Sequence, residues 1–146
     1  MIYLVHHAHA VDSDVDTQRP LSATGRMHVD DLARRAAARG VKPAAIWHSG
    51  KLRARQTAEA FLRACHPLAE FAAIRGLQPT DPPEWIRDLV SEETRDVMLV
   101  GHMPHLPRLL TLLVSGSEAV LLDYPLHGLV ALESVGQRFE ERWRLS

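Results

Sequence analysis

The sequence predicts a three-layer α/β/α sandwich built on a mostly parallel sheet with an antiparallel edge. Short apolar segments of strand type alternate with amphipathic segments of helix length, which is the pattern of strand–helix–strand units. Three of the apolar segments run directly into polar residues, as strands do at the carboxyl edge of a parallel sheet. The chain of 146 residues contains no repeat, linker or low-complexity tract, so we expect a single domain over residues 1–146.

The first half of the chain predicts two strand–helix pairs. Ser22 is expected to cap the first helix, because a serine oxygen accepts hydrogen bonds from the free N–H groups of a helix start. Gly40 suits the end of that helix, and Ser49 is expected to cap the second. The expected elements are a strand at 2–5, a helix at 23–39, a strand at 44–47 and a helix from Ser49 through Ala64.

The second half predicts a further parallel strand between two helices and a closing hairpin. The segment 68–77 is ambiguous and is compatible with a third strand. Residues 80–83, Thr-Asp-Pro-Pro, read as a helix start in which an N-cap residue is followed by proline. Gly136 marks the turn of the hairpin. The expected elements are a helix at 84–90, a strand at 97–100, a helix at 105–114 and a hairpin of 129–133 with 138–145.

The composition excludes some classes of function. The formal net charge is −1, which gives no general attraction to nucleic acid or to a membrane surface. No apolar run reaches membrane-spanning length, no basic leader precedes the first strand, and the single Cys65 fits a reducing compartment. We therefore expect a cytoplasmic protein that binds neither nucleic acid nor membrane. Any anion site has to be built from a few well-placed cations.

Titratable side chains follow three of the predicted strands where each strand ends. His6 and His7 follow the first strand, Arg53 stands one helical turn after the second, and His102 follows the strand at 97–100. Because the carboxyl ends of parallel strands gather at one edge of a sheet, we expect these side chains to converge. One imidazole is suited to attack phosphorus, and an arginine at a helix start is suited to bind the phosphate oxygens. The pattern therefore predicts phosphoryl-transfer chemistry.

Four segments carry a family pattern. In order they are LVHHAHA at 4–10, RPLSATGR at 19–26, SGKLRARQTAE at 49–59 and LVGHMPHL at 99–106. Together they resemble the histidine phosphatase (phosphoglycerate mutase-like) superfamily, and most closely its short SixA-type phosphohistidine phosphatases. The resemblance runs from Met1 to about Leu112, and residues 128–133 and 143–146 look like the last strands of that group. It implies a phosphoglycerate mutase-like fold.

The resemblance also implies a role for each matching residue. His7 would be the nucleophile that becomes phosphorylated, and His102 would bind phosphate oxygens and stabilise the transferring group. Arg53 would clamp the phosphate, and Arg19 would present a further arginine at the mouth of the site. No metal or other cofactor is expected. The implied substrate is a phosphorylated protein, in particular a phosphohistidine, or a small phosphorylated molecule.

The chain departs from the family signature at His6, where the resemblance calls for an arginine that binds phosphate. Arginine is always charged and binds phosphate through two donors, whereas a neutral histidine offers one donor. Losing one such contact costs on the order of 10²–10³ in rate. A nearby phosphate would favour imidazolium at His6, so we expect weak activity that rises as the pH falls toward 6.

A second gap concerns the proton donor for the leaving group. Larger members of the superfamily use a carboxylate on an inserted segment, and this chain is too short to hold that insertion. Asp81 and Glu84 lie near a helix start that is able to approach the site, although a capping role is the simpler interpretation of both. Apart from the proton donor, the resemblance implies that the chain around His127 returns to the site, so this side chain is also able to approach it.

Three alternatives stay open at this point. A relative that lost its arginine would bind a phosphorylated partner without turnover. A phosphatase of small metabolites would share the same motifs. A zinc-dependent hydrolase would need three imidazoles, although the arginines would repel a cation. The histidines considered as zinc ligands are His6, His7, His9, His102 and His105.

Overall fold

The computed structural model describes residues 1–146 and is organised around one six-stranded sheet with the strand order β3-β2-β4-β1-β5-β6. The strands are β1 (Ile2–His6), β2 (Ala45–His48), β3 (Glu70–Ala73), β4 (Val97–Gly101), β5 (Leu129–Val135) and β6 (Arg138–Leu145). The helices are α1 (Ala23–Ala38), α2 (Leu52–Cys65), α3 (Pro83–Ser91) and α4 (His105–Ser115). Every predicted strand and helix is present within one or two residues of its expected bounds, except that α2 begins three residues after Ser49, and the ambiguous segment contains β3.

The four strands β3, β2, β4 and β1 form a parallel sheet, and β5 and β6 form an antiparallel edge. β1 pairs with β4, β4 with β2 and β2 with β3, all in parallel. β5 runs antiparallel to β1, and the β5–β6 hairpin completes the antiparallel edge. The predicted fold class is confirmed.

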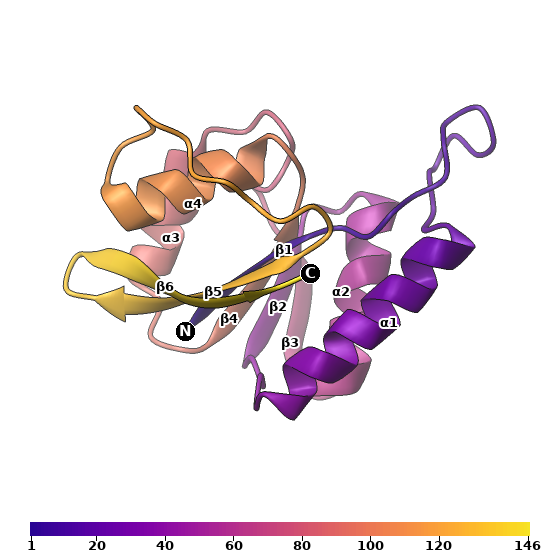
Figure 1. Ribbon diagram of the computed structural model, residues 1–146, viewed down its shortest axis with the longest axis horizontal. Helices are drawn as coiled ribbons and strands as arrows, with labels where there is room; N and C mark the ends of the chain where they lie inside the picture. The colour runs from indigo at the N-terminus through magenta and orange to yellow at the C-terminus, as the bar shows by residue number, and fades with distance from the viewer.

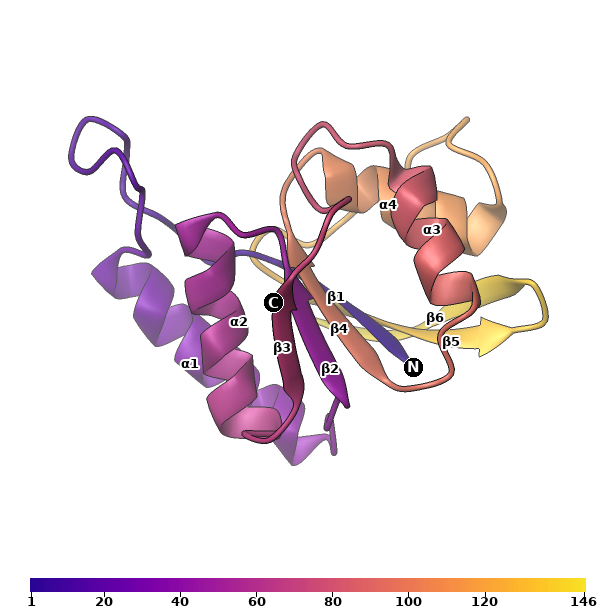
Figure 2. The same ribbon diagram turned by 180° about the vertical axis from the view of Figure 1, so that it is seen from behind.

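Two helices cover each face of the sheet. α1 and α2 pack together on one face, and α3 and α4 on the other (Figures 1 and 2). Successive side chains of β1 point to opposite faces, so Tyr3 and Val5 enter one core cluster while Ile2 and Leu4 enter the other. This explains why the central strands are continuously apolar rather than alternating. No helix combines the length and apolar character needed to cross a membrane.

The two predicted serine caps have different outcomes. Ser22 caps α1 as predicted, and its Oγ accepts a hydrogen bond from the Gly25 N–H at 3.0 Å. The predicted cap of α2 is wrong: α2 begins at Leu52 with Lys51 as its N-cap residue, and no side chain caps it. Ser49 lies two residues before that cap, and its hydroxyl is bonded to His102 instead.

The register of the strands places the predicted site at one edge. His6 lies beside Gly101 in the β1–β4 pair, and His48 lies beside Val100 in the β2–β4 pair. The three strand ends therefore stop at the same level. β5 starts at that level as well, because it runs antiparallel and Leu129 lies beside Val5. The segment before β5 consequently approaches the same edge.

Candidate active site at the carboxyl edge of the sheet

Four imidazole rings gather at this edge. The ring centroids of His6 and His7 lie 4.5 Å apart, and those of His7 and His102 lie 5.1 Å apart. His127, from the segment before β5, stacks on His6 with centroids 4.8 Å apart and planes inclined by 8°. Its ring centroid is 6.1 Å from that of His7. Residues 120 positions apart thus form one cluster.

Hydrogen bonds to β4 and to α2 fix the backbone at His7 and Ala8. The His7 N–H donates to the Gly101 carbonyl at 3.1 Å, and the Ala8 N–H donates to the Thr57 hydroxyl at 3.0 Å. The imidazole of His7 is oriented by a 2.7 Å hydrogen bond from Nδ1 to the Ala8 carbonyl. Because a carbonyl only accepts, Nδ1 carries the proton and Nε2 keeps its lone pair. His7 therefore presents a nucleophilic nitrogen in a fixed orientation.

The pKa of His7 supports this neutral form. Burial lowers the pKa of His7 to about 4, the hydrogen bond to Ala8 opposes the change, and Arg53, His127 and Arg19 lower the pKa further. The attacking nitrogen of a nucleophilic histidine has to be unprotonated. At neutral pH the imidazole of His7 is in the form that such a reaction needs.

His102 is buried beside His7 and is linked to Ser49. Its Nε2 lies 2.6 Å from the Ser49 hydroxyl, and its Nδ1 is buried with no hydrogen-bond partner in the protein. Burial lowers the pKa of His102 to about 3, with smaller contributions from His7, Arg53 and Lys51. A buried polar atom without a protein partner is unusual and needs an explanation.

Arg53, like His102, has a buried side-chain nitrogen without a hydrogen-bond partner in the protein. It lies in the first turn of α2, where the free N–H groups and the helix dipole favour an anion. Its Nε is buried and makes no hydrogen bond within the protein. Burial and the charge of Arg19 lower the pKa of Arg53. Arg53 and His102, which each have a buried polar atom without a protein partner, therefore both lie near His7.

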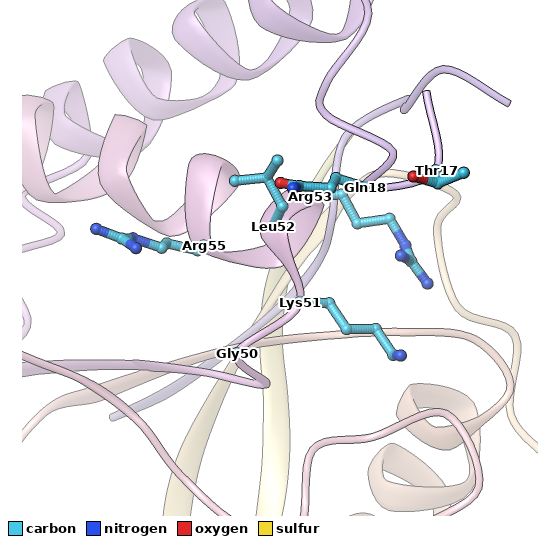
Figure 3. Close-up of a pocket in the computed structure, with 7 residues that line it drawn as sticks. All are labelled: Thr17, Gln18, Gly50, Lys51, Leu52, Arg53 and Arg55. Carbon is cyan, nitrogen blue, oxygen red and sulfur yellow. The ribbon is translucent and has the colours of Figure 1, made fainter. Parts of the chain in front are cut away.

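A cavity of about 410 Å³ opens in front of α2 (Figure 3). The side chains of Lys51 and Arg53 extend to the same side of the helix start, whereas Arg55 extends to the opposite side (Figure 3). Lys51 also lies near enough to His102 to lower its pKa. Lys51 was not predicted as a site residue, although its position directly before a helix start indicates a cation placed to meet an anion. The lining residues are Thr17, Gln18, Gly50, Lys51, Leu52, Arg53 and Arg55.

His6 lies in the cluster as predicted, but its chemistry differs from the expectation. Its Nδ1 accepts a 2.8 Å hydrogen bond from the His127 N–H, so in the neutral ring Nε2 carries the proton. Burial, followed by His7, His127 and Arg53, lowers the pKa of His6 to about 3. Without a bound phosphate this low pKa opposes the imidazolium form of His6, and the expected rise in activity toward pH 6, which depends on a phosphate beside the ring, stays a prediction. His6 offers one uncharged donor where arginine would offer two charged ones.

Arg19 also lies close to the cluster, on the loop between β1 and α1. Its Nε donates to the Val11 carbonyl at 3.1 Å, and its backbone has the left-handed φ of 50°. A non-glycine residue in that region is held there by its surroundings at a cost. The charge of Arg19 lowers the pKa of both His7 and Arg53. Arg19 therefore lies close enough to His7 and Arg53 to act on them through its charge, and its place at the mouth of the site stays a prediction.

The hydrogen bonds of the cluster argue against the alternative of a zinc site. One ring nitrogen each of His6, His7 and His127 lies within 4.8 Å of the others, so three imidazoles do gather. A neutral histidine binds a metal through the nitrogen that carries no proton. In His6 that nitrogen accepts the His127 N–H, and ligation through Nε2 would displace a proton from a ring already acting as an acceptor. The two arginine charges also oppose a cation.

The remaining candidates have structural contacts. His9 is exposed and bonds Ser22 at the start of α1, and His105 is fully buried with neither ring nitrogen bonded. The Asp81 carboxylate accepts the Gln78 N–H at 2.9 Å, and Glu84 lies in the first turn of α3. Neither carboxylate is among the groups that shift the pKa of His7. The cluster around His7 is built from imidazoles and arginines.

A family model supports the grouping of these residues. The model of the histidine phosphatase superfamily, branch 1, matches residues 2–93. The matched range contains His6, His7, Arg19 and Arg53, whereas His102 lies beyond it. No curated protein matches the chain in sequence.

Solved structures share the fold over nearly the whole chain. The protein histidine phosphatase SixA in complex with tungstate has a TM-score of 0.87 at 18% identity, covering 99% of this chain and 96% of its own. A protein of Agrobacterium tumefaciens assigned as the phosphohistidine phosphatase SixA has a TM-score of 0.80 at 26% identity, with coverages of 99% and 96%. The α-ribazole phosphatase of Shigella flexneri has a TM-score of 0.73 at 15% identity, with coverages of 97% and 94%.

Proposed function

This chain belongs to the histidine phosphatase superfamily, branch 1, and on that premise we propose that it hydrolyses phosphohistidine in proteins through a phosphorylated His7. The single observation that carries the proposal is the state of the His7 ring. Its Nδ1 donates to the Ala8 carbonyl, which leaves the Nε2 lone pair free beside Arg53 and His102.

The reaction has two displacement steps. In the first, His7 Nε2 forms a bond to phosphorus while the bond from phosphorus to the leaving atom breaks, and the leaving atom takes the electron pair and a proton. In the second, a water oxygen bonds to phosphorus, the phosphorus–nitrogen bond breaks, and its electron pair returns to Nε2. The water proton departs and inorganic phosphate is released. Arg53 and His102 donate to the phosphate oxygens as charge builds on them.

The local charges support an anionic substrate. Lys51 and Arg53 extend together into the cavity, and their charges are suited to a phosphoryl group and to acidic residues beside it. A phosphoramidate needs less help from the enzyme than an alkyl ester does, because a departing imidazole is readily protonated. This favours phosphohistidine. The fold is also similar to that of a structure holding tungstate, a tetrahedral oxyanion like phosphate.

The test is capture of the covalent intermediate. The protein is incubated with phosphoramidate and analysed by intact mass and by phosphopeptide mapping. We expect an acid-labile phosphoryl group on His7 that is absent in His7→Ala. Turnover of a phosphohistidine-containing protein should exceed that of sugar phosphates by about tenfold or more in kcat/KM. Higher kcat/KM for sugar phosphates would replace the protein substrate with a small metabolite.

One observation favours a second function. His6 supplies a single neutral donor at the signature position, so a phosphate-binding module with little turnover fits the same site. The two functions differ in the variant His6→Arg. If His6 occupies the clamp position, we expect this variant to raise turnover by on the order of 10²-fold, by analogy with restoring an oxyanion donor. Phosphohistidine binding by the wild type without any phosphoenzyme, and turnover only in His6→Arg, would establish the binding module.

A further inference from the structure

We propose that His127 is the proton donor to the leaving group and the proton acceptor for the attacking water. This inference rests on the proposed function and deepens it, because it assigns the general acid that the short chain otherwise lacks. His127 comes from the segment before β5, a part of the chain that the active-site motifs do not include.

The position of His127 follows from the antiparallel edge of the sheet. β5 begins at the level where β1 ends, and the His6 N–H donates to the Gly128 carbonyl at 3.0 Å. This bond ties the segment before β5 to the strand that ends in the nucleophile. The ring of His127 then lies over His6 and 6.1 Å, centroid to centroid, from the ring of His7.

The orientation of His127 is set by three independent contacts. Its N–H donates to His6 Nδ1 at 2.8 Å, its Nδ1 lies 2.7 Å from the His7 carbonyl oxygen, and its ring stacks on His6. Its backbone has a left-handed φ of 52°, a conformation that is uncommon for residues other than glycine, although histidine is among those that adopt it more often. Strain held at a defined position next to a nucleophile is typical of a functional residue.

The hydrogen bonds also decide which nitrogen exchanges protons. The His7 carbonyl only accepts, so Nδ1 of His127 keeps its proton in both the neutral and the charged ring. Nε2 is therefore the nitrogen that gains and loses a proton. A ring fixed by a carbonyl through one nitrogen and free at the other is the arrangement of a general acid–base histidine.

In this mechanism His127 gives up one proton and regains one during each turnover. In the first step, the proton on His127 Nε2 moves to the leaving nitrogen or oxygen as its bond to phosphorus breaks. His127 is then neutral, and Nε2 has a lone pair. In the second step, that lone pair takes a proton from the water that attacks phosphorus. His127 is charged again at the end, and no other reactant is required.

The test uses two phosphate esters that differ in their need for an acid. The variant is His127→Asn, because asparagine tolerates the left-handed backbone and its side-chain amide is able to donate to the His7 carbonyl, but it has no group at the Nε2 position. Rapid-quench measurements follow phosphorylation of His7 by 2,4-dinitrophenyl phosphate, whose leaving group needs no proton, and by phenyl phosphate, whose leaving group does. Breakdown of the phosphoenzyme is followed in the same samples.

We expect His127→Asn to phosphorylate from 2,4-dinitrophenyl phosphate within about threefold of wild type, and from phenyl phosphate at least about 10²-fold more slowly. Breakdown of its phosphoenzyme should slow by a similar factor, since the base is also lost. His28→Asn is the matched control, because the ring of His28 lies 6.4 Å from that of His127 without contacting His7. It should leave both rates unchanged.

Other outcomes of the same experiment would contradict the role of His127 or the proposed function. Equal losses with both esters would make His127 a positioning or phosphate-binding residue and overturn the proposal. The same contrast in His127→Gly, in which glycine also accepts the backbone angle, excludes a folding defect in the asparagine variant. A wild type that forms no phosphoenzyme even from 2,4-dinitrophenyl phosphate would overturn the proposed function and this inference together. A phosphoenzyme without the leaving-group contrast would overturn the inference alone.

Discussion

His6 and His7 are adjacent imidazoles that carry their protons on different nitrogens. The carbonyl of Ala8 keeps the proton of His7 on Nδ1, and the N–H of His127 keeps that of neutral His6 on Nε2. The neutral ring of His7 therefore has a free lone pair at Nε2, whereas the neutral ring of His6 has an N–H donor there. Two neighbouring residues of the same type acquire different roles from the backbone groups that face them.

This difference predicts how the first chemical step depends on pH. Burial is the main cause that lowers the pKa of His7 to about 4 and that of His6 to about 3. Both rings are depleted of the charged form above those values, so their protonation does not change between pH 6 and pH 8. Phosphorylation of His7 by 2,4-dinitrophenyl phosphate should be constant over that range, as measured by rapid quench. A rise of about tenfold toward pH 6 would instead show that His6 acts as imidazolium.

At the scale of elements, the loop from β1 to α1 depends on a close approach at Gly25. The Ser22 N–H donates to the His9 carbonyl at 2.9 Å, and the Ser22 hydroxyl accepts the Gly25 N–H. The start of α1 thereby lies against the backbone that follows His7. A side chain at Gly25 would overlap the His9 carbonyl oxygen. The glycine of the RPLSATGR segment is therefore a packing requirement of this junction.

We expect Gly25→Ala to destabilise the protein by about 1–3 kcal/mol, because the added methyl group forces the helix start away from the loop. Urea unfolding followed by circular dichroism measures the change in midpoint. Arg26→Ala is the control, since residue 26 is the exposed neighbour on the same helix turn. An unchanged midpoint in Gly25→Ala would show that the loop accommodates the methyl group.

At the scale of the whole molecule, the site makes the fold sensitive to acid. His6, His102 and His105 are buried, and burial is the first cause that lowers the pKa of each, to about 3, 3 and 4. In the unfolded chain each returns to an ordinary pKa of about 6.5. The stability they contribute is present above that value and is lost as the pH falls toward the folded-state values, because the unfolded chain then binds more protons.

His7, whose pKa burial lowers to about 4, is a fourth such group, and four groups predict a loss of about 5 kcal/mol per pH unit well below pH 6. His105 is the informative one to replace, since neither of its ring nitrogens has a partner. We expect His105→Leu to be more stable at neutral pH and to reduce the pH slope by about a quarter, as measured by urea unfolding from pH 7 to pH 5. An identical slope in His105→Leu and wild type would mean that His105 binds protons equally in the folded and the unfolded chain, so that folding does not lower its pKa.

Much of this architecture could be predicted from local signals. The apolar segments and their polar ends predicted the strands, the alternation predicted the layers, and Ser22 predicted the start of α1 correctly. Ser49 misled the prediction of α2, since a serine before a helix looks the same whether it caps the helix or holds His102. Only the position of His102 in space distinguishes the two cases.

The sequence by itself determined the fold class, the convergence of His7, Arg53 and His102, and the substitution at His6, because strand order and residue type are local properties. The tertiary structure alone decided the protonation of His6 and His7, the role of Ser49 and the approach of Lys51 and His127. These depend on which backbone carbonyls and N–H groups face each ring, and on burial. Such contacts join residues as far apart as His6 and His127, so no local pattern encodes them.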